Sequence, residues 1–277
     1  MNGELIKNLL REAEPFQCLG EVPAAIMSGL DSARVLVEGL ASIAAKGSQG
    51  EYFLVSKERY AHYLAACKTS VRSGGMILDV GNAPGHLGYL LWSMGYNVKG
   101  INLNALYRDL YPESAWCELF DVKECDIESS TLPFPDSSFD AVIFTEVLEH
   151  IAVKHPSAIL REFQRVLVPG GAVIFSTPNV CNISNVIALM LGKNVFWPTG
   201  MFYGSLDRHN REWTPAEVAE LFQAAGFLSE SVWGMCDHSN WRAGGVEIVY
   251  DQLADRIGRF AMMRNTIVGV YRTPGGL

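Results

Sequence analysis

The sequence predicts an α/β protein in which helices cover a doubly wound, mostly parallel sheet. From residue 76 onward, short apolar runs alternate with segments of helical length. The first run, 76–80, is apolar on both faces apart from one carboxyl group, as a central parallel strand is. The first five runs end in polar or glycine-rich residues. Because ligands bind at the carboxyl ends of such strands, these ends are expected to form one site.

The N-terminal 70 residues are expected to be helical and to form a cap on the main domain, which is assigned to residues 71–277. Apolar positions recur at helical spacing over 33–45 and again over 56–66, with Ser56 as the expected N-cap. The aromatic cluster of this region consists of Tyr52, Phe53, Tyr60 and Tyr63. We expect these rings to pack in the core rather than to contact a ligand.

The stretch 76–87 reads as a buried strand, a glycine turn and the start of a helix that continues through 88–94. Gly81 and Gly85 bracket the turn, where a backbone without Cβ can adopt positive φ or approach a ligand closely. Such a unit directs backbone N–H groups toward a polar ligand. The spacing is neither a full dinucleotide fingerprint nor a P-loop. A plain structural turn after the first strand is the alternative.

The later elements follow the same alternation. Further strands are expected at 95–104, 118–127, 139–145, 172–176, 227–232 and 265–271. An amphipathic helix is expected over 156–168, ended by the Pro-Gly-Gly sequence at 169–171. Another helix should begin at Thr214 as N-cap, followed by Pro215, with Glu217 completing a capping box.

Composition narrows the class of protein. With 277 residues, 49% hydrophobic and 19% charged, the chain suits one large globular domain. Its net charge of −8 disfavours nucleic acid as a partner. The six cysteines are scattered without zinc spacing, so we expect reduced thiols, no metal site and a cytoplasmic location. No secretory signal and no membrane span are expected.

Several segments in order resemble the class I S-adenosylmethionine-dependent methyltransferases, in the small-molecule branch that is methyltransferase type 11-like. They are the loop at 78–85, the acidic turn at 125–127, the fourth-strand motif at 132–144 with 147–151, the Pro-Gly-Gly motif at 165–174 and the segment 208–227. The resemblance covers about 76–271. It implies a seven-stranded Rossmann-like sheet with S-adenosyl-L-methionine as cofactor. It also implies methyl transfer by in-line displacement to a small molecule, such as a secondary metabolite, a sugar or a lipid-linked group.

The resemblance assigns the cofactor site to the following residues: Asp79, Gly81, Asn82, Ala83, Gly85, Asn102, Asp126, Ile127 and Thr145. Asp79 is expected either to contact the cofactor while orienting the loop, or to cap the N–H groups of the turn. Ala83 replaces the usual middle glycine, and Asn102 replaces the acidic residue that binds the ribose. A neutral amide forgoes a charge-assisted bond, a difference of about 1 kcal/mol. These departures motivate an alternative, a non-catalytic, cofactor-binding regulatory subunit of the same fold.

A lid over 179–213 is expected to face the methyl acceptor, because the family places such residues after the fifth strand. His150 and His209 are the candidate catalytic bases, since imidazole titrates near neutral pH. The alternatives are a structural histidine at a helix end for His150, and a solvated loop or a salt bridge to Glu212 or Asp207 for His209. The aromatic residues Phe196, Trp197, Phe202 and Tyr203 are expected either to line an apolar acceptor pocket or to bury a homodimer contact.

Overall fold

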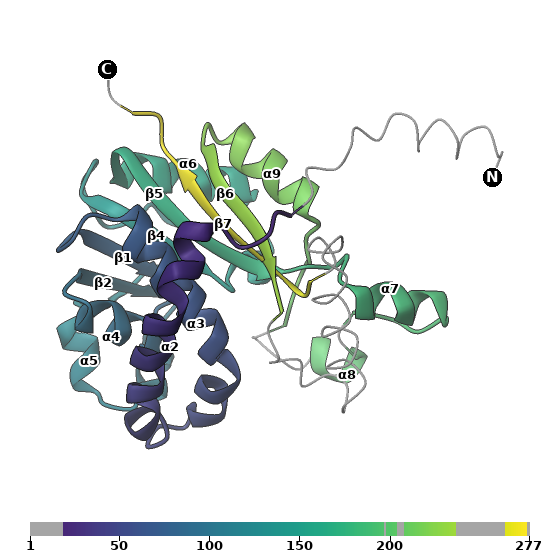
Figure 1. The fold of residues 1–277 in the computed structure, drawn as a ribbon, viewed down its shortest axis with the longest axis horizontal. Helices are drawn as coiled ribbons and strands as arrows, with labels where there is room; N and C mark the ends of the chain where they lie inside the picture. The colour runs from purple at the N-terminus through teal and green to yellow at the C-terminus, as the bar shows by residue number, and fades with distance from the viewer. Residues whose placement is uncertain (1–18, 197, 204–207, 237–263, 276–277) are drawn as a thin grey trace.

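The computed structural model describes residues 19–196, 198–203, 208–236 and 264–275. Its centre is a seven-stranded sheet in the order β3-β2-β1-β4-β5-β7-β6, shown in Figure 1. The strands are β1 (Met76–Val80), β2 (Asn97–Asn102), β3 (Lys123–Glu124), β4 (Phe139–Thr145), β5 (Leu167–Pro178), β6 (Leu228–Met235) and β7 (Thr266–Arg272). Strands β1 to β5 pair in parallel, whereas β7 runs antiparallel to both β5 and β6. The expected doubly wound, mostly parallel sheet is confirmed.

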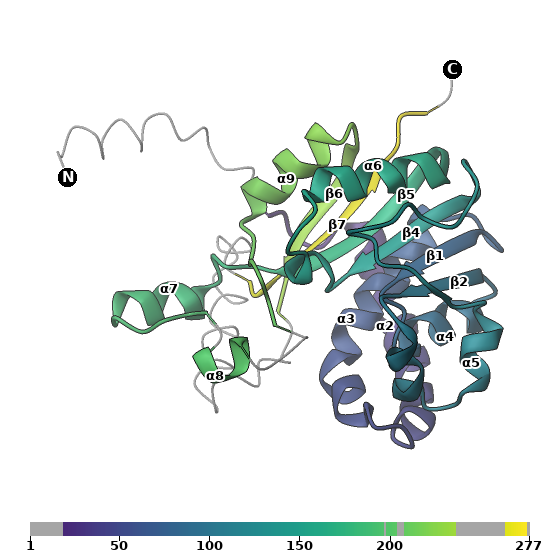
Figure 2. The same ribbon diagram turned by 180° about the vertical axis from the view of Figure 1, so that it is seen from behind.

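Helices cover both faces of the sheet, as the two opposite views show (Figure 1; Figure 2). One face carries α2 (Ala24–Ala44), α3 (Gly50–Ser70) and α4 (His86–Ser93), and the other carries α6 (Pro156–Val166) and α9 (Pro215–Ala224). Alternating strand residues divide between two cores. In β4, for example, Ile143 packs in the core under α2 to α4, and Val142 packs in the core under α6 and α9. The boundary of an N-terminal cap at residue 70 stays a prediction.

The N-terminal helices are longer than expected. Helix α3 begins at Gly50, so Ser56 is not its N-cap but a buried residue within it, which accepts a hydrogen bond from the Arg59 guanidinium (2.7 Å). Phe53, one turn earlier, is fully buried, and its burial favours extension of the helix toward the N-terminus. Residues 1–18 lie outside the described part of the chain.

The third strand is the largest difference from the expected elements. The region 118–127 holds only the two-residue β3, and it is preceded by the short helix α5 (Ala115–Leu119). Trp116 and Phe120 are four residues apart and both buried, with ring centroids 6.5 Å apart. That spacing suits a helical turn packing its face on the core. A short strand is also usual at a sheet edge.

Other boundaries shift by a few residues. Helix α6 ends at Val166, and β5 then runs through the Pro-Gly-Gly sequence that was expected to separate helix from strand. The capping box at the start of α9 is confirmed, because Thr214 and Glu217 bond each other's backbone N–H. Between β5 and α9 lie α7 (Ile183–Met190) and α8 (Thr199–Phe202). In both views α7 extends away from the sheet (Figure 1; Figure 2). Among the helices of the described residues, none has the length and apolarity needed to cross a membrane.

Candidate functional site

The loop after β1 is held from within the protein by a chain of amides and a phenol. Asn82 donates to the Asp79 carboxyl group (2.7 Å) and accepts from the Tyr111 hydroxyl (2.5 Å). Asn102 donates to the Tyr111 oxygen (3.0 Å) and accepts from the backbone N–H of Ala83 (2.9 Å). Both ends of the Asn102 amide are therefore engaged in fixing the loop. Its contact with a ribose stays a prediction.

Tyr111 is a loop-supporting residue that the sequence analysis missed. It follows the short 3-10 helix η1 (Ala105–Leu110), outside every motif, so no local pattern marks it. A Cβ added at Gly85, which has φ of 83°, would lie 2.6 Å from its ring. Gly81, with φ of 73°, is similarly close to Val147, since a Cβ there would lie 2.9 Å from a methyl carbon. Both glycines are required by backbone conformation and by close packing.

Asp79 supports the loop through a side chain rather than through the N–H groups of the turn. It is buried at the end of β1, and its carboxyl group accepts from the Asn82 amide. Burial raises the pKa of Asp79 to about 7, because the charged form loses its hydration, and the Asn82 hydrogen bond offsets part of that effect. Direct contact with a cofactor stays a prediction.

The loop and the first turn of α4 fit the polar cofactor that the resemblance implies. Gly85 occupies the N-cap position without a side-chain cap, so the first N–H groups of α4 are available for a polar ligand. Both ring nitrogens of His86, the first residue of α4, are buried, and neither has a hydrogen-bond partner among the described residues. Burial lowers the pKa of His86 to about 4, so its imidazole is neutral at pH 7. S-adenosylmethionine carries polar groups that such a loop is suited to hold.

The remaining predicted cofactor residues lie at the ends of β3 and β4, the strands that flank β2 and β1 in the sheet. Thr145 ends β4, and Asp126 and Ile127 follow β3. The Asp126 carboxylate accepts from the backbone N–H of Glu128 (2.9 Å) and from the Ser129 hydroxyl (2.7 Å). The hydroxyl bond is the main reason that the pKa of Asp126 lies below its usual range. An adenine contact by Asp126 and Ile127 stays a prediction.

A buried ionic group that the sequence analysis missed joins α3 to the ends of β4 and β5. Arg59 donates to the Glu146 carboxylate (2.6 Å), whose other oxygen accepts from Ser176 (2.6 Å). The Tyr63 hydroxyl also bonds Ser176 (2.6 Å). Glu146 adopts a positive φ of 54°, a strained conformation for a non-glycine residue and one that concentrates at functional sites. The partners come from distant segments, so no sequence motif could reveal the pairing.

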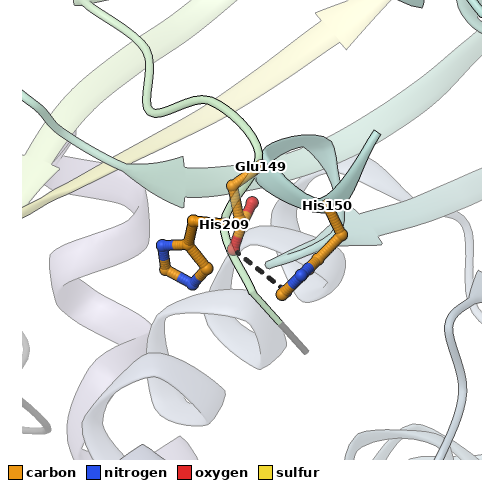
Figure 3. Close-up of side chains that lie close together, drawn as sticks. All are labelled: Glu149, His150 and His209. Atoms are coloured by element: carbon orange, nitrogen blue, oxygen red, sulfur yellow. Dashed lines mark ion pairs between the residues drawn. The ribbon is translucent and has the colours of Figure 1, made fainter. Parts of the chain in front are cut away.

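The segment 208–213 docks on the short 3-10 helix η2 (Leu148–His150), which follows β4. Asn210 donates through its backbone N–H to the Glu149 carbonyl and through its side chain to the His150 carbonyl, both at 2.7 Å. The His150 ring donates in turn from Nδ1 to the Arg208 carbonyl (3.0 Å). These contacts place His209 beside η2, as Figure 3 shows. The two predicted base candidates are thus brought together, with ring centroids 5.1 Å apart.

Glu149 completes this group, which we call the Glu-His-His cluster (Glu149, His150 and His209). Its side chain is buried, with one oxygen accepting from Thr177 (2.9 Å) and the other 4.0 Å from His150 Nε2. The pKa of Glu149 is raised to about 8, mainly because burial removes water from the charged form. The nearby charge of Glu146 is the second cause. The sequence analysis singled out His150 but not the glutamate before it, although a carboxyl group within an apolar turn was the available signal.

The contacts that a structural role of His150 and a salt bridge of His209 would predict are present as well. His209 bonds Glu212 (3.1 Å), the salt-bridge partner named from the sequence, and His150 bonds a backbone carbonyl as a structural histidine would. Phe202 and Tyr203 pack edge to face, but Tyr203 and Phe196 are largely exposed. Trp197 and Asp207 lie outside the described residues. A pocket lined by these aromatic side chains stays a prediction.

Known proteins are similar to this chain in sequence and in fold. Residues 78–175 match the model of a methyltransferase domain family. The chain is 29% identical over 167 residues to a protein of Mycolicibacterium smegmatis described as a probable S-adenosylmethionine-dependent methyltransferase. That match covers 59% of this chain and 56% of the relative, so the chain spans little more than half of the relative's length. A ubiquinone biosynthesis O-methyltransferase of Paraburkholderia phymatum is 28% identical over 164 residues, covering 59% and 68%.

Solved structures agree on the architecture. A SAM-dependent methyltransferase of Archaeoglobus fulgidus superposes with a TM-score of 0.55 at 16% identity, covering 80% of this chain and 99% of that one. The [4+2]-cyclase SpnF superposes with a TM-score of 0.54 at 18% identity, covering 94% and 99%. At these identities the likeness shows the fold alone. Taken together, the matched domain at 78–175 and the sequence relatives show that the chain is similar to S-adenosylmethionine-dependent methyltransferases.

Proposed function

We propose that this protein transfers a methyl group from S-adenosylmethionine to an oxygen of a small-molecule acceptor. The observation that carries the proposal is the Glu-His-His cluster, which lies at the carboxyl ends of β4 and β5 beside the strand that carries the cofactor loop. Strand ends at this edge are where ligands of doubly wound sheets bind. Proton-accepting groups are therefore available where an acceptor has to meet the cofactor.

Two groups of residues have different roles: one would hold the cofactor, and the other would orient the acceptor. When bound, S-adenosylmethionine supplies an electrophilic methyl group on its sulfur. The loop 81–85, braced by Asn82, Asn102 and Tyr111, would hold the cofactor at the end of β1. His209 and His150 would orient the acceptor hydroxyl and take up its proton. The Nδ1 of His150 donates to the Arg208 carbonyl and the Nδ1 of His209 lies 3.1 Å from the Glu212 carboxylate, so both rings are held in place. Alignment of this kind is the main contribution that a protein makes to such a displacement.

The names of the relatives point to a class of acceptor. The Paraburkholderia relative is a ubiquinone biosynthesis O-methyltransferase, and a demethylmenaquinone methyltransferase of Tropheryma whipplei is 32% identical over 122 residues. Both names refer to quinones. The exposed apolar side chains of the lid, among them Met190 and Phe196, support an apolar acceptor here.

A second candidate is a protein of this fold that does not transfer methyl groups. The structural likeness to a cyclase supports it, because the same fold serves another reaction there. The engagement of Asn102 within the protein, in place of an acidic ribose ligand, also favours it.

A labelling experiment separates the two candidates. The purified protein is incubated with methyl-labelled S-adenosylmethionine and fractions of a metabolite extract, with hydroxylated quinone precursors as defined acceptors. The first proposal predicts label in an acceptor fraction and a loss of at least about a hundredfold in turnover for His209→Ala. Tight binding of the donor with no transfer to any fraction would favour the second candidate. Equal transfer by wild type and variant would remove His209 from the mechanism.

A further inference from the structure

We propose that a cleft between α2, α3 and α4 binds an amphipathic monocarboxylate, a molecule with an apolar chain and one carboxylate group. The three helices lie on the same face of the sheet (Figure 1; Figure 2). The cleft has a volume of about 490 Å³, which is within the range of small-molecule sites. Its lining comes from these helices and from the segments before β1 and β2: Gly29, Ser32, Ala33, Leu36, Leu64, Ala65, Lys68, Val71, Ser73, Ser93, Met94 and Tyr96.

The cleft lies at the edge of the sheet opposite to the Glu-His-His cluster. Val71 and Ser73 precede β1, and Tyr96 directly precedes β2, so they mark the amino ends of these strands. The loop 81–85 and the cluster follow the carboxyl ends of their strands. A molecule in the cleft would therefore leave both the cofactor loop and the acceptor position open, and the proposal does not rest on the proposed function.

Most of the lining is apolar. Leu64 and Ala65 of α3 are buried, whereas Leu36 of α2 and Met94 after α4 are only half-buried. An apolar chain placed along these side chains would remove their exposed parts from water. Burial of one methylene group strengthens binding by about fourfold, so a chain gains affinity with each carbon that the cleft can hold.

The polar part of the lining favours a single negative charge. Lys68 lies in the last turn of α3, is exposed, and has no ion-pair partner in the described part of the chain. The two arginines nearest to the lining in sequence are already paired, Arg34 with Glu58 and Arg72 with Asp140. None of the residues that line the cleft is acidic. One ammonium group in such a cleft matches the carboxylate of a monoanion better than a cationic or multiply charged head group.

The first test is calorimetric titration of the full chain with dodecanoate, at concentrations below those at which it forms micelles. We expect one saturable site per chain. Dodecyltrimethylammonium carries the same chain with a positive head group and should bind at least about tenfold more weakly. Decanoate is two methylene groups shorter and should bind up to about fifteenfold more weakly. Saturating dodecanoate should leave the affinity for S-adenosylhomocysteine unchanged, because the two sites lie at opposite edges of the sheet.

Two variants and a matched control locate the site. Ser32→Trp places an indole in the cleft from an exposed position and should lower the affinity for dodecanoate at least about tenfold. Ser28→Trp is its control: Ser28 is one turn earlier on α2, is equally exposed and also donates to the carbonyl three residues before it, but does not line the cleft. Lys68→Met removes the charge but keeps an unbranched side chain. Its affinity should fall about threefold to tenfold, and the remaining binding should lose its dependence on salt.

The outcomes are distinct once circular dichroism has shown that each variant is folded. One site that is weakened in Ser32→Trp and Lys68→Met but retained in Ser28→Trp supports the proposal. Absence of saturable binding to the wild type overturns it. Equal affinity in Ser32→Trp, or competition with S-adenosylhomocysteine, would also overturn it, because the ligand would then bind elsewhere. Equal affinity for the cationic analogue would contradict the carboxylate as the group that Lys68 selects.

Discussion

The loop after β1, which we propose to hold the cofactor, and the Glu-His-His cluster lie at the same edge of the sheet but are built in opposite ways. The loop at 81–85 is continuous in sequence, and its supports Asn82, Asn102 and Tyr111 lie within one β-α-β unit and the segment after it. The cluster combines the turn after β4 with a segment from which it is separated by α6, β5, α7 and α8. Local construction makes the loop recognisable from sequence. Long-range construction hides the pairing of the cluster's residues from a reading of the sequence.

The difference implies that a substitution can impair one region without the other. The largest effect on turnover is expected for a substitution in the cluster. His209→Ala removes an imidazole that bonds Glu212 and lies beside His150. Turnover should fall by about a hundredfold or more, because a positioned acid–base group is lost. Affinity for S-adenosylhomocysteine, measured by calorimetry, should change less than about twofold because no loop contact is lost. A loss of cofactor affinity in the same variant would show that the cluster and the loop do not act independently.

The same contrast explains which features could be predicted from the sequence. The strand–loop–helix unit, the ends of β1 and β4 and the capping box of α9 were predictable, because each depends on neighbouring residues. The short β3 was not, since the burial of Trp116 favours a helical turn that strand propensity did not anticipate. At the site, His150 and His209 were found by residue type. Arg59 was not, because its partner Glu146 is 87 positions away.

A second prediction concerns the pH dependence of the loop support. In the unfolded chain Asp79 has an ordinary pKa near 4, and in the fold burial raises its pKa to about 7. Between these values the folded protein keeps a proton that unfolding releases, so the free energy of unfolding falls as pH rises from 4 to 7 and levels off above. Asp79→Asn should remove this slope, a relative gain of up to ~4 kcal/mol at pH 7. Denaturant unfolding at several pH values measures it, and parallel curves for the two proteins would contradict the buried proton.

Tyr111→Phe tests how much the hydrogen bonds that support the loop contribute to cofactor binding. The variant keeps the ring that packs on Gly85 but loses the hydroxyl between Asn82 and Asn102. One net hydrogen bond is worth about 1 kcal/mol, so S-adenosylhomocysteine should bind about fivefold more weakly. An unaltered cofactor affinity would mean that the amide network does not set the geometry of the loop.

The smallest effect is expected for Asn102→Asp. A carboxylate would still accept from the Ala83 N–H and would add charge toward a ribose, but it would no longer donate to Tyr111. The gain and the loss are similar in size, so cofactor affinity should rise or stay within about threefold of wild type. A loss of tenfold or more would show that the amide donor of Asn102 is indispensable to the loop.

The central claim is that the loop binds the cofactor of the family independently of the acceptor-side cluster. It is tested most directly by calorimetric titration of S-adenosylhomocysteine into the wild type and into the double variant Glu149→Gln/His209→Ala. The account predicts one site per chain with the same affinity in both proteins, together with a rise in unfolding temperature on binding. Absence of binding to the folded wild type, or binding that disappears in the double variant, would contradict it.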